Sequence, residues 1–371
     1  MGRARRRSRR PHRSAGLRRI RHARQRAPGA LWPRARPRPL GTGGSVMTPI
    51  TGTRQRRRRP IAAVGVAFLC AYAQAQTCSV GAPTLAFAAF SPISGAALSA
   101  TGTVPISCTW PLLGGSANVK VCLALNASQP LALTNAGDAI SFGLYVDPSF
   151  ANPWGSGPSQ AIAFTMTRNL LGGTVTQNVN VYGRIAAAQT TVPTSGNGNT
   201  VYTRTFTSAD TSLHYAPYGP LSPVPDCGSA MTAVPGTPFT VNVSVINNCT
   251  IAATNITFAT QTALDRPVTG VGQLMVQCTQ NDAYRVSLSG GLLGTVTSRL
   301  MAGETGANVA YQLYLDRGYA TIWGDGSSGT SPLTGIGTGL VQFIPIYARV
   351  PSQSTPAPGV YTDTVTATIQ F

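Results

Sequence analysis

Short stretches of alternating apolar and polar residues recur from about residue 76 onward, and no long stretch has a helical period. Clear examples are VTQNVNVYGRI, YRVSLSG, FTVNVSV and YTDTVTATIQF. Glycine, proline, asparagine and serine separate these stretches, which is typical of short β-strands joined by turns. The pattern predicts an all-β chain whose strands form sandwiches of two packed sheets.

The same sequence blocks occur twice in the same order. CSVGAPTLAFAAF, which begins at Cys78, aligns with CTIAATNITFATQ, which begins at Cys249. Further along, LYVDPSFANPWGSG corresponds to LYLDRGYATIWGDG, VYGRI to IYARV, and GNTVYTRTFT to GVYTDTVTAT. A period this long indicates two copies of a whole domain rather than a solenoid repeat. We expect one domain at residues 76–226 and the other at 249–371, joined by a proline-rich linker at 227–248.

Residues 1–75 differ from the rest of the chain in composition. They contain 20 arginines and no acidic residue, so the remainder has nine bases (29 − 20) and all ten acids. An arginine run is followed by the apolar segment IAAVGVAFLCAY and the small residues of AQA. This pattern is typical of a secretory signal peptide cleaved after Ala75, with Met47 as a candidate true start. The exported part carries no basic surface, so we expect no nucleic-acid partner.

Six cysteines remain after the predicted cleavage, and an even number in an exported chain indicates disulfides. The parallel spacing within the two copies predicts two bridges, and elimination pairs the remaining two cysteines. The predicted bridges are Cys78–Cys108, Cys249–Cys278 and Cys122–Cys227. Each of the first two closes a loop of about 30 residues and stabilises the fold by roughly 3–4 kcal/mol in the chain-entropy model.

Several blocks taken together resemble the spore coat protein U domain family. They are the Cys-to-Phe segment, the second Cys about 30 residues later, SRLMAGETGANVAYQLYLD, the aromatic-Trp-Gly turn and the terminal GVYTDTVTATIQF. The resemblance covers nearly all of 249–371 and, with more divergence, the first copy. It implies a subunit of an archaic chaperone–usher pilus, and the two-domain arrangement resembles that of the tip adhesins of such pili.

The resemblance also implies how such a subunit is assembled. In the family, an immunoglobulin-like fold lacks its last strand, and the N-terminal extension of a neighbour completes it by donor-strand complementation. The implied partners are a periplasmic pilus chaperone, an outer-membrane usher and the next pilus subunit. The implied location is the cell surface, reached through the periplasm.

An alternating strand just before Cys249 is the candidate donor strand, because single-domain members carry their donor strand in that place. Its apolar face consists of Phe239, Val241, Val243 and Val245. We expect this segment to complete the first domain in cis, while the second domain receives a strand in trans; alternatively, it is the first strand of the second domain. After the predicted cleavage only Gln76 and Thr77 precede Cys78, too few for a donor strand, which favours a position at the fibre tip.

The last strand of the chain is the expected chaperone-binding element. Its alternating positions, which match those that pair with a chaperone in related systems, are Val365, Ala367, Ile369 and Phe371. The alternation alone would suit any final strand of a sandwich, so this assignment depends on the resemblance.

Loops of the first copy carry bulky apolar residues beside turn formers, and an exposed apolar patch marks an interaction site. The candidate adhesive residues are Trp110, Leu112, Leu113, Leu170 and Leu171. Trp154 has a counterpart in Trp323, so we interpret it as part of a structural turn.

Motifs for catalysis are missing from the sequence, which has neither GxSxG nor a phosphate-binding loop. His214 is the one histidine of the predicted exported chain, and Asp316 and Asp325 do not have EF-hand spacing. We therefore expect no enzymatic activity, cofactor or metal. A secreted carbohydrate-binding protein and a non-fibrous coat protein are the alternatives to a pilus subunit.

Overall fold

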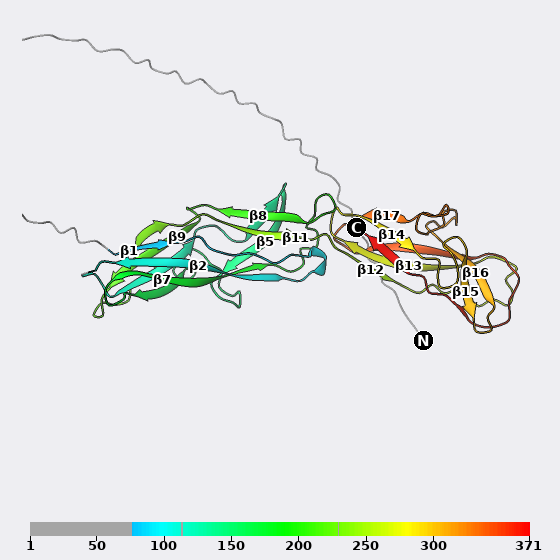
Figure 1. Cartoon of the computed structure of the whole chain (residues 1–371), viewed down its shortest axis with the longest axis horizontal. Coiled ribbons are helices and arrows are strands. Elements are labelled where there is room, and N and C mark those ends of the chain that lie inside the picture. Colours follow the sequence, from blue (N-terminus) through cyan, green and yellow to red (C-terminus); the bar gives the residue numbers. More distant parts are fainter. Residues whose placement is uncertain (1–75, 113, 229) are drawn as a thin grey trace, which may run out of the picture. The chain divides into compact units, whose positions relative to one another are not determined.

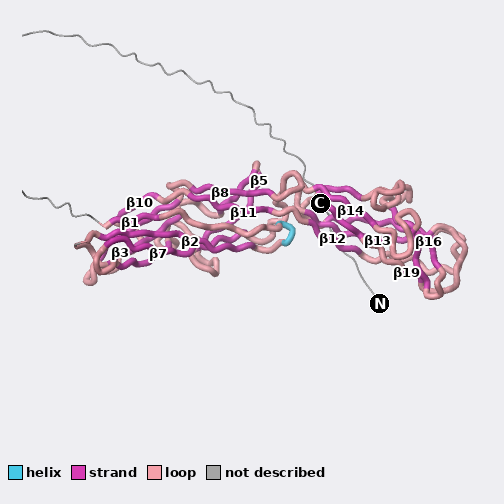
Figure 2. Tube along the Cα trace, viewed as in Figure 1, coloured by secondary structure: helices cyan, strands magenta, loops and turns pink. Residues whose placement is uncertain are grey.

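The computed structural model describes residues 76–112, 114–228 and 230–371. The predicted signal peptide and Leu113 lie outside these ranges. Strands and loops make up almost all of the described chain, with one short helical turn (Figure 2). Among the described residues, no helix has the length and apolarity that a membrane span requires.

The strands form two lobes, each with its own cluster of buried apolar side chains. We call residues 76–245 the N-terminal lobe and residues 249–371 the C-terminal lobe. The N-terminal lobe contains the 3-10 turn η1 (Pro92–Ser94) and strands β1 (Thr77–Val80), β2 (Leu98–Trp110), β3 (Asn118–Leu125), β4 (Leu131–Asn135), β5 (Asp138–Tyr145), β6 (Ile162–Thr167), β7 (Gly173–Ile185), β8 (Thr200–Phe206), β9 (Thr211–Tyr218), β10 (Thr232–Pro235) and β11 (Phe239–Val245).

The C-terminal lobe repeats most of this order (Figure 1). Its strands are β12 (Cys249–Ala253), β13 (Val268–Cys278), β14 (Ala283–Leu288), β15 (Arg299–Gly303), β16 (Asn308–Tyr314), β17 (Leu333–Ile336), β18 (Gln342–Val350), β19 (Tyr361–Thr362) and β20 (Ala367–Gln370). The all-β fold expected from the alternating pattern is confirmed.

Each lobe consists of two antiparallel sheets around one core. In the N-terminal lobe the larger sheet has the order β1-β2-β7-β5-β4-β8-β11 and the smaller β10-β9-β3-β6. In the C-terminal lobe the orders are β12-β13-β18-β16-β15-β19 and β17-β14-β20. Burial alternates along the strands, as in β11 and β13, because successive side chains point to opposite faces of a sheet.

All three expected disulfides are present in the structure. Cys78–Cys108 and Cys249–Cys278 each join directly paired residues of two neighbouring strands, with a Cα–Cα distance of 4.1 Å in both lobes. Cys122–Cys227 joins β3 to the segment between β9 and β10, with a sequence separation of 105.

The duplicated turns that contain Asp147 and Asp316 are closed by their carboxylates. Asp147 accepts hydrogen bonds from the backbone amides of Ser149 and Asn152 at 3.0 and 2.8 Å, and Asp316 accepts one from Thr321 at 2.7 Å. The Ser149 hydroxyl, together with the backbone amides of Asn152 and Ala151, lowers the pKa of Asp147 from 3.8 to about 2. Both aspartates therefore act as turn caps, which accounts for their repetition.

Candidate strand-acceptor face of the C-terminal lobe

One long segment crosses the N-terminal lobe beside β8 and β9. β10 pairs antiparallel with β9, and β11 pairs antiparallel with β8 over seven residues, from Phe239 opposite Phe206 to Val245 opposite Thr200. Figure 1 shows β11 running alongside β8. The segment interpreted from sequence as a linker therefore contributes two strands to the sheets of the N-terminal lobe.

The apolar face of β11 is part of the core. Its four inward residues are Phe239, Val241, Val243 and Val245, with exposed fractions of 8%, 0%, 0% and 0%. Phe239 stacks on Phe206 with ring centroids 4.5 Å apart. On its other edge, the carbonyl oxygen of Ser244 accepts a hydrogen bond of 2.9 Å from the Phe90 amide. β11 thus lies between β8 and the segment around Phe90, and it is not the first strand of the C-terminal lobe, whose first strand is β12.

The two lobes have the same strand order except at one place. In the larger sheets β1, β2, β7, β5, β4 and β8 correspond to β12, β13, β18, β16, β15 and β19. In the smaller sheets β9, β3 and β6 correspond to β20, β14 and β17. The described C-terminal lobe has no equivalent of β10 or β11. Its β19 and β20 are therefore edge strands, with a paired neighbour on one side only.

Burial differs between the lobes along this edge. The inward residues of the first segment of the N-terminal lobe are buried, whereas their counterparts 171 positions later (249 − 78) are partly exposed. The buried residues are Cys78, Val80, Leu85 and Phe87, and the partly exposed counterparts are Cys249, Ile251, Ile256 and Phe258. Tyr202 of β8 is 1% exposed, but the equivalent Tyr361 of β19 is partly exposed. The C-terminal lobe thus leaves apolar side chains uncovered where β10 and β11 cover those of the N-terminal lobe.

The final strand β20 corresponds residue by residue to β9 of the N-terminal lobe. Leu125 pairs with Thr211 in the N-terminal lobe, and Leu288 pairs with Ala367 in the C-terminal lobe. The amides of both leucines donate to the following Trp-Gly turn at 3.2 Å, which fixes the equivalence of the two registers.

Residues further along β20 are more exposed than their counterparts in β9. Leu213 is fully buried, whereas Ile369 is only partly buried; Tyr215 is 7% exposed, whereas Phe371 is 48% exposed. Val365, which precedes β20, is also partly buried and packs against the core. We call this set of partly exposed apolar residues the open face, and it comprises Ile251, Ile256, Phe258, Tyr361, Val365, Ala367, Ile369 and Phe371.

A carboxylate lies beside the open face. Asp363 accepts a hydrogen bond from the Tyr311 hydroxyl at 2.6 Å and another from the Leu292 amide at 2.8 Å. The equivalent position in the N-terminal lobe is Arg204, whose guanidinium lies over the Phe206 ring. Burial, together with the bond to Asp363, raises the pKa of Tyr311, so this hydroxyl remains a hydrogen-bond donor across the physiological range.

Some of the candidate adhesive residues have the exposed side chains that were expected of them, and one does not. Leu112, Leu170 and Leu171 are strongly exposed, while Leu113 lies outside the described residues. The inclusion of Trp110 was wrong, because its side chain is 2% exposed and its Nε1 donates to the Ser116 carbonyl at 3.0 Å.

Two of these loops lie side by side at one end of the N-terminal lobe. Trp110 pairs with Gly173, and a side chain at Gly172 would come within 2.5 Å of the Pro111 carbonyl oxygen. Arg168 donates to the Gly114 carbonyl at 2.9 Å, which fixes one loop against the other.

Sequence reasoning missed a third apolar loop at the same end. Residues 219–228 follow β9 after Tyr218, which pairs with Asn118, and Leu221 and Val224 are exposed there. The segment YGPLSPVP carries no charge and has no strand period, so the sequence did not distinguish it from the proline-rich linker that follows.

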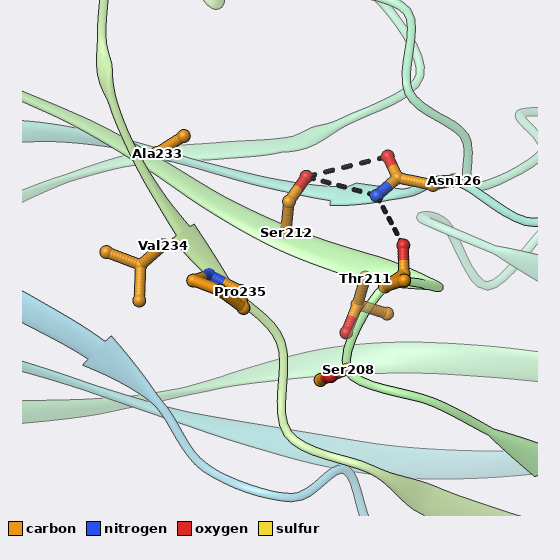
Figure 3. Close-up of a pocket in the computed structure, with 8 residues that line it drawn as sticks. Asn126, Ser208, Thr211, Ser212, Ala233, Val234 and Pro235 are labelled. Carbon is orange, nitrogen blue, oxygen red and sulfur yellow. Dashed lines mark hydrogen bonds between the residues drawn. The ribbon is translucent and has the colours of Figure 1, made fainter. Parts of the chain in front are cut away.

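One pocket of the N-terminal lobe has no titratable group in its lining. A shallow pocket of about 340 Å³ lies where β9 meets β10, with Val234 and Pro235 opposite Asn126 and Ser212 (Figure 3). Its eight lining residues include no titratable side chain. His214 contacts the Ser212 hydroxyl at 3.0 Å. Within the described ranges, no three His, Cys, Asp or Glu side chains are grouped so that they could hold a metal.

Comparison with known families accounts for the duplication. The sequence model described as the Spore Coat Protein U domain matches residues 64–209 and 236–368. The chain belongs to the Spore Coat Protein U domain family. The second match begins three residues before β11 and so includes this strand, although β11 pairs within the N-terminal lobe.

Individual relatives of this Spore Coat Protein U domain chain are distant. Protein U of Myxococcus xanthus is 34% identical over 116 residues, which are 29% of this chain and 64% of that protein. The chain thus matches less than two thirds of the length of this relative.

Two solved complexes are similar to the chain at low levels. The chaperone–tip adhesion subunit complex CsuC–CsuE, from the archaic chaperone–usher Csu pili of Acinetobacter baumannii, has a TM-score of 0.43 and 16% identity, covering 80% of this chain and 100% of that one. A chaperone–tip adhesin complex of CFA/I fimbriae has a TM-score of 0.23 and 9% identity, covering 76% and 94%.

Proposed function

We propose that this protein is an exported subunit of a chaperone–usher pilus, whose C-terminal lobe accepts a donor strand from the next subunit. The observation that carries the proposal is the matched strand order of the two lobes, with β10 and β11 present in one and without an equivalent in the other. A β-strand in that place would cover the open face and pair with the free edges of β19 and β20.

The N-terminal lobe has the same fold with the additional strands β10 and β11 in place, and this comparison supports the assignment. Four inward side chains of β11 contribute roughly 1.5–3 kcal/mol each when buried, so a strand of this kind is a large part of the stability of a lobe. A C-terminal lobe without such a strand needs a substitute during export. A periplasmic chaperone that pairs with β20 would provide it until an outer-membrane usher exchanges the chaperone for the next subunit.

We place this subunit at the fibre tip, where it mediates surface attachment. β11 is used within the N-terminal lobe, and the predicted cleavage site leaves only Gln76 and Thr77 before Cys78. With that cleavage, the described residues offer an acceptor face and no free donor strand, which supports a position at the tip. The exposed leucines of the N-terminal lobe lie at the end opposite to Val245, where the chain continues to the C-terminal lobe.

An engineered donor strand should stabilise the C-terminal lobe. We expect a second copy of residues 232–245, attached after Phe371 through a four-residue turn, to raise its unfolding temperature by about 10 °C or more, because several apolar side chains become buried. The register is suitable because Tyr215, the equivalent of Phe371, pairs with Thr232. Differential scanning calorimetry, which records the unfolding transitions of the two lobes, measures the effect.

Matched substitutions identify the face that is used. In the extended protein, Ile369→Asp should remove the gain, because the side chain points toward the core, while Thr368→Asp on the exposed face should preserve it. Equal unfolding temperatures with the native and a scrambled extension would show that the lobe is already closed, and the proposal would fail.

The tip assignment predicts where the protein is found and how it binds. Immunogold labelling should mark fibre ends only, and the double substitution Leu170→Ser/Leu171→Ser should reduce attachment to polystyrene severalfold by removing exposed apolar area. The exposed pair Leu292 and Leu293 of the C-terminal lobe is the control, because its replacement by serine should leave attachment unchanged. Labelling along the fibre shaft would contradict a tip position.

A further inference from the structure

The bridge between Cys122 and Cys227 has no equivalent in the C-terminal lobe. The other two bridges join residues that already pair between neighbouring strands, and they occur at the same place in both lobes. The third bridge reaches from β3, an inner strand of its sheet, to the segment that leads into β10 and β11. The additional bridge and the additional strands are thus found together in one lobe.

This bridge shortens the covalent route through the N-terminal lobe. Along the main chain, the exposed loop at 111–117 is connected to the C-terminal lobe through β3 to β11. Through the disulfide, the route runs from that loop along β3 to Cys122, across to Cys227, and along 228–248. The 105-residue stretch that contains β4 to β9 is bypassed.

We propose that the Cys122–Cys227 bridge is a mechanical clamp that carries tension from the apolar end of the N-terminal lobe directly to β10 and β11. Tension enters β11 at Val245, next to the C-terminal lobe, and peels it from β8 and then β10 from β9. Peeling stops at Cys227, because the bridge passes the load to β3. Without the bridge, the load continues into β9 and β8 and unravels the lobe. That the protein bears tension in the cell rests on the proposed function. The covalent route through the disulfide does not depend on that function.

Single-molecule pulling on the full exported chain, residues 76–371, tests the clamp. One handle is attached to an azide-bearing phenylalanine at position 112 and the other to the C-terminus. In the wild type, the N-terminal lobe should lengthen only by residues 112–122 and 227–248. In C122S/C227S, the total extension should increase by 105 residues, about 37 nm at roughly 3.5 Å per residue. The first rupture force should be the same in both, because the same strands are peeled.

The variant C78S/C108S is the matched control. Its bridge lies outside the pulled section, so its removal should leave the extension unchanged. If C122S/C227S does not fold, the folded wild type is pulled before and after dithiothreitol, which reduces the bridge to two thiols and is itself oxidised to a cyclic disulfide. Reduction of Cys249–Cys278 then adds a separate increment of 29 residues in the C-terminal lobe.

Two results would overturn the clamp. One is a wild type that shows the long extension with the bridge intact, and the other is a C78S/C108S variant that lengthens as much as C122S/C227S. Neither result affects the donor-strand experiment on the C-terminal lobe, and a failure of that experiment leaves the extension pattern unchanged.

Discussion

Val243→Asp is expected to unfold the N-terminal lobe. Val243 is fully buried in the middle of β11, opposite Tyr202 of β8. An aspartate there has no partner among the surrounding apolar side chains and must be buried as an unpaired charge or as a protonated acid. Either state costs several kcal/mol, which is comparable with the whole stability of a domain. Urea unfolding and limited proteolysis of the purified protein measure the loss.

The neighbouring Asn242→Asp is the matched control. Asn242 lies on the same strand but points to solvent, so the same new charge should change the unfolding free energy by less than about 0.5 kcal/mol. Deletion of 239–245 should have the same effect as Val243→Asp on the N-terminal lobe and leave the C-terminal lobe able to take a donor strand. A stable N-terminal lobe in the Val243→Asp variant would show that β11 is dispensable.

The partner of β11 illustrates what local sequence can and cannot predict. The alternation in FTVNVSV was enough to predict a strand and to identify which side chains point inward, because that period depends only on the chain itself. It does not decide between the first lobe and the second, because both assignments are compatible with the alternation. The choice depends on which sheet has a free edge next to the chain, and that edge is formed by β8, some 40 residues earlier.

The candidate adhesive loops show a second limit of prediction from local sequence. Trp110 was assigned to an exposed loop because proline and glycine follow it, yet it continues the inward alternation of Val104, Ile106 and Cys108 in β2. Reading the period through to the end of the strand would have placed it in the core. Leu221 was overlooked because its segment has no period at all, and its position is set by the strand pairs on either side.

The sequence did not predict the buried polar network of the C-terminal lobe. Arg299 and Gln312 lie within a block that supported the family resemblance, but nothing in their spacing distinguished them from surface residues. In the structure, Arg299 is fully buried and Gln312 is 7% exposed. The N-terminal lobe uses a single residue in this place: Gln129 donates to the carbonyl oxygens of Leu144 and Trp154 at 2.7 and 2.9 Å. The two lobes therefore use different side chains to donate hydrogen bonds to the buried carbonyl oxygens at this place.

Arg299→Met should destabilise the C-terminal lobe by about 3–5 kcal/mol, because several buried acceptors lose a charged hydrogen-bond donor. Its guanidinium donates to the carbonyl oxygens of Ser289 and Trp323 at 2.9 Å each, to that of Val296 at 3.2 Å, and to the side chain of Gln312. Methionine fills a similar volume but donates no hydrogen bond, so these buried acceptors lose their partner. Burial lowers the pKa of Arg299, yet an arginine remains charged at neutral pH.

The measurement uses the protein with the appended donor strand, so that the C-terminal lobe is complete in every variant. Arg299→Lys should retain part of the stability, because an ammonium group offers three donors instead of five and lacks the planar geometry that reaches separate carbonyls. Arg285→Met, on the exposed side of β14, is the matched control and should cost less than about 1 kcal/mol. If the Arg299→Met and Arg285→Met variants unfold at the same urea concentration, the buried network adds nothing, and the stability of this lobe must come from its apolar core and its donor strand alone.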